Sequence, residues 1–282
     1  MKKSMNFLIV GAGTVGTATG LGLIHLGHNV TFFDTNPDKI NKLRVGGYRT
    51  ILSLNENPDF EIALICVQTD LNQSENFDLL PLREAIFNLA KYALDNNTKI
   101  TIAIKSTVLP GTTQMIQNEI FESLPKSQNF IELAYLPEFL RERSAESDFL
   151  SGPIRIVASP SRPIRVLFKE ILQPTCREFI EFERFEEAEL MKISHNLANI
   201  VEISFWNQMK VIADRFSVDT LVIKDAVQNS AESRYNLDYA YASGLPIAGH
   251  CLPKDLKAVR AFMKEENMRR GVVEGLHEFN FE

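Results

Sequence analysis

Two polar side chains one helical turn apart give the first indication of chemistry in this sequence. Lys192 and Asn196 are four residues apart in a stretch of helical spacing, so they share one helix face and can address one substrate group. An ammonium and an amide that point into a cleft suit an alcohol that loses a proton or becomes an oxyanion. The alternative is a solvated helix face. Glu189 on the same surface, and the apolar residues that follow, favour a functional pair.

A cysteine in a polar, Gly- and Pro-bounded setting is a candidate nucleophile. Cys251 lies two residues before Pro253, and proline is favoured in the first turn of a helix, so a helix is expected to begin beside the cysteine. The positive end of that helix, with a neighbouring lysine and histidine, favours thiolate over thiol. The alternative is a buried structural thiol. Cys66 and Cys176 lie in apolar, strand-like segments, where that alternative is preferred.

A glycine-rich loop follows the first apolar run. Its G-x-G-x-x-G pattern consists of Gly11, Gly13 and Gly16, with Thr14 and Val15 between the last two glycines. In this pattern the first glycine permits a tight turn, the second lets the backbone approach a pyrophosphate, and the third lets helix and strand pack closely. The phosphates then face a helix N-terminus. The loop therefore predicts a dinucleotide site.

The residue that ends the second apolar run narrows the dinucleotide to NAD. Asp34 lies eighteen residues beyond Gly16, where a carboxylate can bind the hydroxyls of the adenosine ribose and repel a 2′-phosphate. NAD is therefore the expected cofactor. The alternative, a glycine turn followed by a surface aspartate, requires the strand, loop, helix and acidic residue to coincide by chance.

The elements that must position these residues can be predicted from hydrophobic periodicity. Apolar runs rich in β-branched residues occur at Phe7 to Val10, Asn29 to Phe33, Ile62 to Val67, Ile100 to Ile104, Phe130 to Ala134 and Ile154 to Val157. Helical spacing lies between most of them, at Thr14 to Leu26, Leu82 to Leu94 and Thr112 to Phe121. Thr112 is expected as the N-cap of the last helix. This alternation predicts an α/β fold with a Rossmann-like, doubly wound parallel sheet.

A helical domain is expected after a short strand near Cys176 to Ile180. Phe185 to Phe216 contains neither Pro nor Gly, and as a helix of about 32 residues it would extend about 48 Å, enough to form the spine of a second domain. We expect an NAD-binding domain at 1–183 and a helical central domain at 184–282. Beyond Asp255 only one helix and a tail are expected. The Phe- and Ile-rich long helix favours a homodimer.

The composition fits a folded protein that acts on small molecules. The 282 residues are 45% hydrophobic, and 30 basic against 36 acidic residues give a net charge of −6 without a long run of like charges. Neither a nucleic-acid nor a membrane partner is therefore expected, and no apolar segment approaches the roughly 20 residues of a membrane span. Three widely spaced cysteines predict neither a disulfide framework nor a metal site, which fits the cytoplasm.

Four further segments carry chemistry in a specific order. They are Lys105 to Thr113 (KSTVLPGTT), Pro137 to Glu142 (PEFLRE) with Ala145 and Asp148 after it, Ala188 to Lys192 (AELMK) leading to Asn196 and to Ile203 to Asn207 (ISFWN), and Gly249 to Asp255 (GHCLPKD). Together these segments resemble the UDP-glucose/GDP-mannose dehydrogenase family. The resemblance extends over essentially the whole chain, but without the C-terminal α/β domain that holds much of the nucleotide in relatives.

The resemblance implies that a primary alcohol, either a nucleotide sugar such as a UDP-hexose or a smaller alcohol, is oxidised to a carboxylate in two hydride transfers. A Cys251 thiolate would attack the intermediate aldehyde to form a thiohemiacetal, which becomes a thioester that water hydrolyses. The implied roles are water activation by Thr107, Glu138 and Asp255, oxyanion stabilisation by Lys192 and Asn196, cofactor contacts by Thr69 and Thr107, and substrate contacts by Glu138, Leu140, Glu142, Arg234 and Gly249.

Departures from the family pattern leave the substrate open. Gln68-Thr69-Asp70 lies where relatives usually carry Gly-Thr-Pro, and Ile247 to His250 replaces a more glycine-rich loop. The missing C-terminal domain leaves two expectations open: the chain is part of a longer enzyme, or it is a short member that acts on a smaller alcohol. Two other hypotheses remain: a β-hydroxyacid dehydrogenase, which transfers one hydride and needs no cysteine, and a noncatalytic NAD-binding protein.

Overall fold

The computed structural model describes residues 4–73, 76–230 and 251–281. The chain divides into two compact units, Met1–Ser194 and His195–Glu282. The boundary predicted at residue 183 precedes the long helix, whereas this division falls within that helix.

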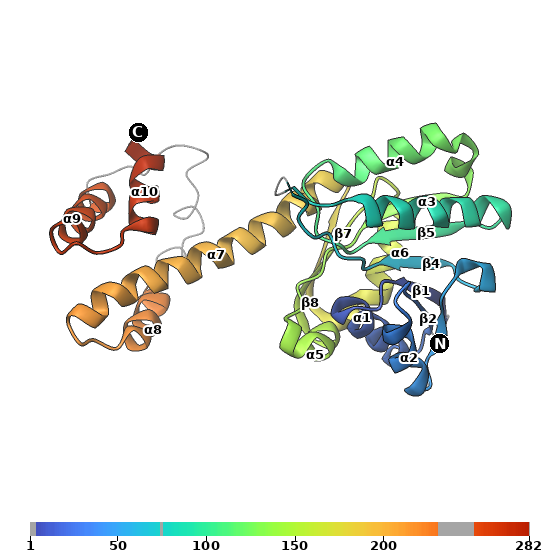
Figure 1. Cartoon of the computed structure of the whole chain (residues 1–282), viewed down its shortest axis with the longest axis horizontal. Coiled ribbons are helices and arrows are strands. Elements are labelled where there is room, and N and C mark those ends of the chain that lie inside the picture. The colour runs from blue at the N-terminus through green and yellow to red at the C-terminus, as the bar shows by residue number, and fades with distance from the viewer. Residues whose placement is uncertain (1–3, 74–75, 231–250, 282) are drawn as a thin grey trace. The chain divides into compact units, whose positions relative to one another are not determined.

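An eight-stranded sheet forms the first unit (Figure 1). The strands are β1 (Asn6–Val10), β2 (Asn29–Phe33), β3 (Arg49–Ile51), β4 (Ile62–Ile65), β5 (Ile100–Ile104), β6 (Ile131–Tyr135), β7 (Gly152–Ala158) and β8 (Cys176–Phe182). Their order is β3-β2-β1-β4-β5-β6-β7-β8, and every neighbouring pair is parallel except β6 and β7. The predicted doubly wound sheet is confirmed, with one antiparallel pair and the short β3 as additions.

Helices cover both faces of this sheet. They are α1 (Thr14–His25), α2 (Pro37–Val45), α3 (Leu80–Asp95), α4 (Thr112–Ser123), α5 (Ala145–Leu150) and α6 (Arg162–Leu172). One apolar core lies under α3 and α4, and a second lies under α1, α2, α5 and α6. The chain reverses direction across the sheet between β1 and β4. At such a switch point, the loops at the carboxyl ends of the strands leave a crevice for a ligand.

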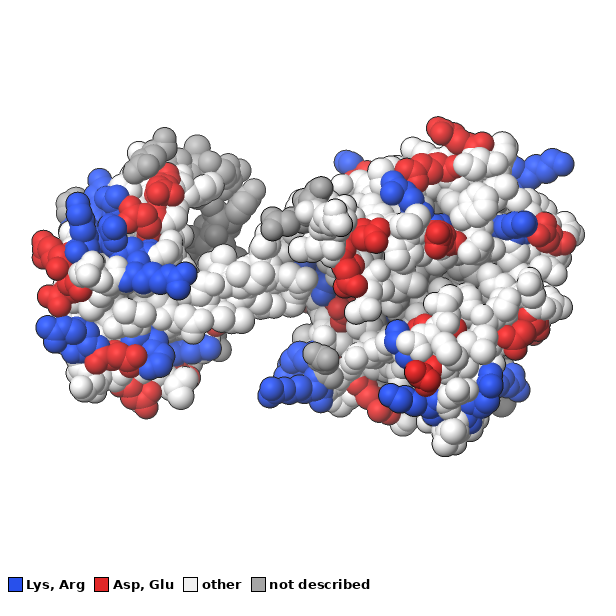
Figure 2. All heavy atoms as spheres, in the orientation of Figure 1, with Lys and Arg blue, Asp and Glu red and all other residues white. Residues whose placement is uncertain are grey.

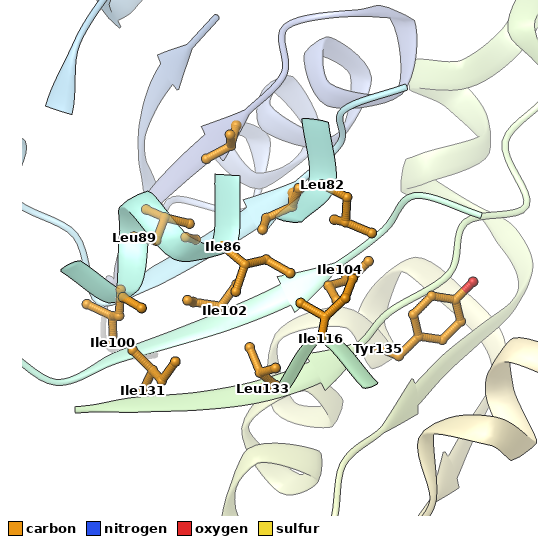
Figure 3. Close-up of a cluster of buried hydrophobic side chains, with 14 of the residues drawn as sticks. Leu82, Ile86, Leu89, Ile100, Ile102, Ile104, Ile116, Ile131, Leu133 and Tyr135 are labelled. Carbon is orange, nitrogen blue, oxygen red and sulfur yellow. The ribbon is translucent and has the colours of Figure 1, made fainter. Parts of the chain in front are cut away.

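Aliphatic side chains on β5 and β6 fill the core under α3 and α4. Figure 3 shows Leu82, Ile86 and Leu89 of α3 facing the branched side chains of β5, while the ring of Tyr135 lies at the end of β6 with its hydroxyl pointing away from them. Every residue of β5 is buried, because a parallel strand that is covered on both faces reads as a continuous apolar run.

The second unit is helical, and the long helix predicted from the sequence is confirmed as α7 (Phe185–Arg215), which begins in the first unit. It is followed by α8 (Thr220–Ser230), α9 (Cys251–Glu265) and α10 (Gly271–Phe281). No helix among the described residues is both long and apolar enough to cross a membrane.

The prediction of an unstructured tail after α9 is wrong, because residues Gly271–Phe281 form the helix α10. Glu274 in the first turn of this helix forms ion pairs with Arg260 and Arg270. Met263 of α9 and Val273 of α10 are buried. The contact with Arg260 of α9 and the local pair with Arg270 stabilise a helix that contains two glycines and that its own sequence favours only weakly.

Candidate functional site

The glycine loop has the geometry of a dinucleotide cradle. Gly11 adopts φ +99° in the turn after β1, and its N–H donates to the carbonyl of Phe33 at the end of the neighbouring strand β2, at 2.8 Å. A Cβ on Gly16 would lie 1.9 Å from the Gly11 carbonyl oxygen, so no larger residue fits. A Cβ on Gly13 would meet nothing within 4 Å. Gly16 therefore lets α1 pack closely against the glycine loop, whereas the space beside Gly13 is open to a ligand.

Asp34 lies at the end of β2 and is held from three directions. Its Oδ2 accepts the Ala12 N–H at 2.8 Å and lies 3.3 Å from Lys39 Nζ, while its Oδ1 accepts the Asn36 N–H at 2.9 Å. The carboxylate is 8% exposed. These contacts fix its orientation at the rim of the cradle. Lys39, from the first turn of α2, is a site residue that was not predicted from the sequence; its position five residues after Asp34 was the available signal.

A cavity of about 710 Å³ extends from the glycine loop across the ends of β2 and β4. It is lined by Gly11, Gly13, Thr14, Val15, Asp34, Lys39, Cys66, Gln68 and Asp70, among others. The size is within the range of cofactor sites. Thr69 lies beside this lining, and its hydroxyl donates to the Thr107 carbonyl at 2.8 Å, which ties the loop after β4 to the loop after β5.

Two of the predicted catalytic residues meet at the end of β6. Lys192, which is 5% exposed, donates from Nζ to the Glu138 carbonyl oxygen at 2.6 Å and lies 3.4 Å from its Oε1. The other carboxylate oxygen of Glu138 accepts the Leu140 N–H at 2.5 Å. The Lys192 ammonium also lies 5.1 Å from the centroid of the Phe139 ring. Lys192 is thus a buried, fixed cation and not part of a solvated helix face.

Glu189, one turn before Lys192, joins α7 to the loop after β5. The side chain is fully buried, and its two carboxylate oxygens accept the N–H groups of Gly111 at 2.6 Å and Thr113 at 2.8 Å. Gly111, with φ +90°, is the N-cap of α4, so the expectation of Thr112 as N-cap is wrong. The reason is that a carboxylate from α7 supplies the hydrogen bonds that an N-cap side chain would otherwise make.

Asp148 fixes the loop that carries Glu138 and Leu140. Its carboxylate accepts the Arg141 N–H at 2.9 Å, forms two bonds with the Arg141 guanidinium at 2.7 and 3.0 Å, and accepts the Ser144 hydroxyl at 3.0 Å. These bonds, with the Arg141 side chain first among them, hold the pKa of Asp148 well below its usual range. The carboxylate therefore stays charged, and the loop stays tied to α5.

Two buried ionisable groups follow the strands β4 and β5. Burial lowers the pKa of Lys105, which follows β5, to about 8. Burial raises the pKa of Cys66, which follows β4, to about 12. Cys66 and Cys176 are free and half-buried, and burial also raises the pKa of Cys176. Both cysteines therefore persist as thiols near neutral pH, as expected for residues without a nucleophilic role.

The remaining predicted residues lie elsewhere. Asn196 follows Lys192 in α7 and belongs to the second unit. The helix expected beside Cys251 is confirmed as α9, which begins at that residue and also contains Asp255. Glu142 begins a short 3₁₀ turn, Glu142–Ser144. The side chains of Glu142, Cys251 and Asp255 lie outside the described part of the structure. So do the whole residues Arg234 and Gly249. The described residues contain no cluster of His, Cys, Asp and Glu that could hold a metal ion.

Comparison with known proteins identifies the two units. Residues 53–175 match the NAD binding domain of the UDP-glucose/GDP-mannose dehydrogenase family, and residues 186–282 match its central domain. The chain is 27% identical to GDP-mannose 6-dehydrogenase of Pseudomonas syringae pv. tomato over 283 residues, which cover 90% of the chain and 63% of that protein. It is 28% identical to UDP-glucose 6-dehydrogenase of Rickettsia prowazekii over 288 residues, which cover 94% and 64%.

A solved structure agrees with this assignment. GDP-mannose dehydrogenase from Pseudomonas aeruginosa superposes with a TM-score of 0.89 at 22% identity, over 98% of the chain and 68% of that structure. The chain thus spans somewhat less than two thirds of the length of the curated relatives described above. Since the two family models match consecutive segments in the same order as the NAD-binding and helical units, the chain belongs to the UDP-glucose/GDP-mannose dehydrogenase family.

Proposed function

We propose that this chain oxidises a primary alcohol to a carboxylate with NAD, in two hydride transfers through a thioester on Cys251. The observation that carries the proposal is the buried Lys192 ammonium, bound to Glu138 at the carboxyl end of the sheet. A buried charge is costly and is retained where chemistry needs it. The overall reaction converts one alcohol, two NAD and one water into one carboxylate, two NADH and three protons.

The residues of the cradle fit NAD. The open space at Gly13 and the uncapped N-terminus of α1 suit a pyrophosphate, because backbone N–H groups point toward it. Asp34, whose orientation is fixed, would accept the ribose hydroxyls, and Lys39 would contact the same sugar. Thr69 and Thr107 would line the nicotinamide end. When bound, NAD supplies the hydride acceptor.

The chain's own groups supply the rest of the chemistry. An ammonium has three protons, and Lys192 directs two of them to Glu138. The third is available to the substrate oxygen, where Lys192 and Asn196 together would stabilise the oxyanion that forms when the alcohol loses its proton. The same pair would stabilise the oxyanion of the thiohemiacetal.

In the second half of the reaction, Cys251 forms the thioester and Glu138 assists its hydrolysis. The Cys251 thiolate forms a bond to the aldehyde carbon while the carbonyl π electrons move to oxygen. Loss of the second hydride leaves a thioester. Water then attacks this carbon, Glu138 accepts a proton from the water with Thr107 and Asp255 in supporting positions, and the thiolate leaves.

The substrate class is a nucleotide sugar or a smaller primary alcohol. The two curated relatives act, by their names, on GDP-mannose and UDP-glucose, and the chain is nearly equally identical to both. The proposal therefore specifies the reacting group, a primary alcohol, and not the base of a nucleotide.

Trapping the covalent intermediate tests this proposal. After incubation with NAD and a panel of nucleotide sugars and simpler alcohols, intact-mass and peptide analysis should find an acyl adduct on Cys251. The Cys251→Ser variant should form one NADH and release aldehyde, whereas the control Cys176→Ser should behave as wild type. Full turnover to the acid by Cys251→Ser would rule out the thioester and favour a single-step or otherwise different dehydrogenase.

We also propose that the chain forms a homodimer through α7. Leu197, Ile200 and Ile203 are 55%, 56% and 61% exposed, and their spacing places them along one side of the helix. Lys and Arg as well as Asp and Glu lie on the visible face of each unit (Figure 2). Ile200→Glu should shift the sedimenting species from dimer to monomer; a wild-type monomer at micromolar concentration would refute the proposal.

We further propose a cytoplasmic location for this chain. The free thiols of Cys66 and Cys176 fit the reducing conditions of that compartment.

A further inference from the structure

Lys105 is a buried cation with little to stabilise it. Its side chain is 5% exposed, and within the described residues its ammonium makes one hydrogen bond, to the Leu136 carbonyl at 3.5 Å, which is long. It also borders an enclosed cavity of about 10 Å³, room for at most one water. Burying an ammonium with so few partners costs stability, which is reflected in its lowered pKa.

The charged and titratable groups around this ammonium come from four elements. Glu138, from the loop after β6, and Cys66, after β4, favour its charged form; Arg155 of β7 and Lys192 of α7 oppose it. The direct contact of Lys105 is its hydrogen bond to the Leu136 carbonyl, two residues before Glu138.

The backbone between the two lysines shows what Lys105 holds. The Leu136 N–H donates to the Ile104 carbonyl at 2.8 Å, and the Leu136 carbonyl accepts from Lys105. Pro137 has no N–H to anchor the next peptide. The carbonyl of Glu138 then accepts from Lys192. Two buried lysines thus hold alternate carbonyls on either side of Pro137, one from the sheet and one from the helix.

We propose that Lys105 is a positioning residue that fixes the Leu136–Pro137–Glu138 turn, so that the Glu138 carboxylate stays directed at Lys192, and that the chain retains it at a cost in stability. This proposal rests on the proposed function, which assigns Glu138 its role in the reaction. A lysine that only filled the core would be better replaced by an apolar side chain of similar length, because such replacements of poorly compensated buried charges are often neutral or stabilising. Replacing Lys105 with an apolar residue should therefore lower function while it keeps or raises stability.

The Lys105→Met variant tests this separation in the full chain. Methionine has a similar length and flexibility but neither charge nor donor. Lys99→Met, which removes an exposed lysine just before β5, is the matched control. Two measurements need no substrate: the thermal midpoint at pH 7, and hydrogen–deuterium exchange of the peptide 137–144, whose Leu140 N–H is bonded to the Glu138 carboxylate.

For Lys105→Met we expect a thermal midpoint equal to or above that of wild type. We also expect exchange at least about tenfold faster in this peptide, because the contact that holds the Leu136 carbonyl is lost. Lys99→Met should match wild type in both measurements. Unchanged exchange would overturn the proposal. So would a lower midpoint or failure to fold, because Lys105 would then be a structural residue.

Turnover separates this inference from the proposed function. With any alcohol that wild type oxidises, Lys105→Met should show kcat lowered by about tenfold or more and an unchanged affinity for NAD, since the cradle is untouched. An unchanged kcat would overturn the positioning role. If wild type oxidises no alcohol, the proposed function fails, and the exchange measurement still decides whether Lys105 holds the turn.

Discussion

Replacing Glu189 with glutamine perturbs the contact that joins α7 to the sheet loops. In wild type each carboxylate oxygen accepts one backbone N–H, from Gly111 and from Thr113. A glutamine keeps the shape of the side chain but has a single acceptor oxygen. Its amide NH₂ must then face one of these two N–H donors in a fully buried position.

The expected loss of unfolding free energy is about 3 kcal/mol. One charge-assisted hydrogen bond contributes about 1.5–3 kcal/mol, and the donor left unsatisfied adds about 1–3 kcal/mol. Loss of the negative charge at the N-terminus of α4 adds about 0.3–1 kcal/mol. The smaller desolvation cost of a neutral amide offsets part of this sum. Because Lys192 lies one turn beyond Glu189, the hydrogen bond from Lys192 to the Glu138 carbonyl should weaken as well.

Urea unfolding followed by far-UV circular dichroism measures the effect. With a slope of about 2 kcal/mol per molar urea, the midpoint should fall by about 1.5 M. The fluorescence of Trp206, the single tryptophan, reports separately on the second unit. Glu186→Gln is the control, because it removes only a 3.5 Å surface contact with Arg184 and should cost at most about 1 kcal/mol. A Glu189→Gln protein within about 0.5 kcal/mol of wild type would refute this account of the α4 cap.

Three further predictions concern the cofactor, a buried charge and the thiols. Gly13→Ala should fold as wild type but bind NAD at least about tenfold more weakly by calorimetry, whereas Gly16→Ala, with its Cβ 1.9 Å from a carbonyl oxygen, should fail to fold stably. Folded Lys105 releases its proton near pH 8 and the unfolded chain near 10.4, so wild-type stability relative to Lys105→Met should rise by on the order of 3 kcal/mol between these values in chemical denaturation. Iodoacetamide at pH 7.5 should label Cys251 well before Cys66, whose pKa is raised to about 12; equal rates would count against a Cys251 thiolate.

Strands and helices with strong periodicity could be predicted from the sequence because burial on both faces leaves a continuous apolar signal, as in β5. The short β3 could not, since its three residues, Arg49–Ile51, alternate and lack that signal. Helix α10 was missed because Gly271 and Gly275 argue against a helix, while the ion pair of Glu274 with Arg260 of α9 is tertiary. Local propensity is weak evidence where tertiary contacts decide.

The site divides in the same way. The glycine loop and Asp34 were predictable because their spacing is fixed by the turn that binds a dinucleotide. The burial of Lys192 and the cap formed by Glu189 depend on how α7 packs on loops that lie far away in sequence. The contact of buried Lys105 with the Leu136 carbonyl is likewise a product of packing, and no local pattern indicates it.

Counting NADH is the most direct test of the central claim. A limiting amount of each candidate primary alcohol, among nucleotide sugars and simpler compounds, is incubated with excess NAD and the full chain until the reaction ends. Two NADH per alcohol, a carboxylate product and no free aldehyde are the predicted result. One NADH per alcohol, with a carbonyl compound as the final product, would contradict the account.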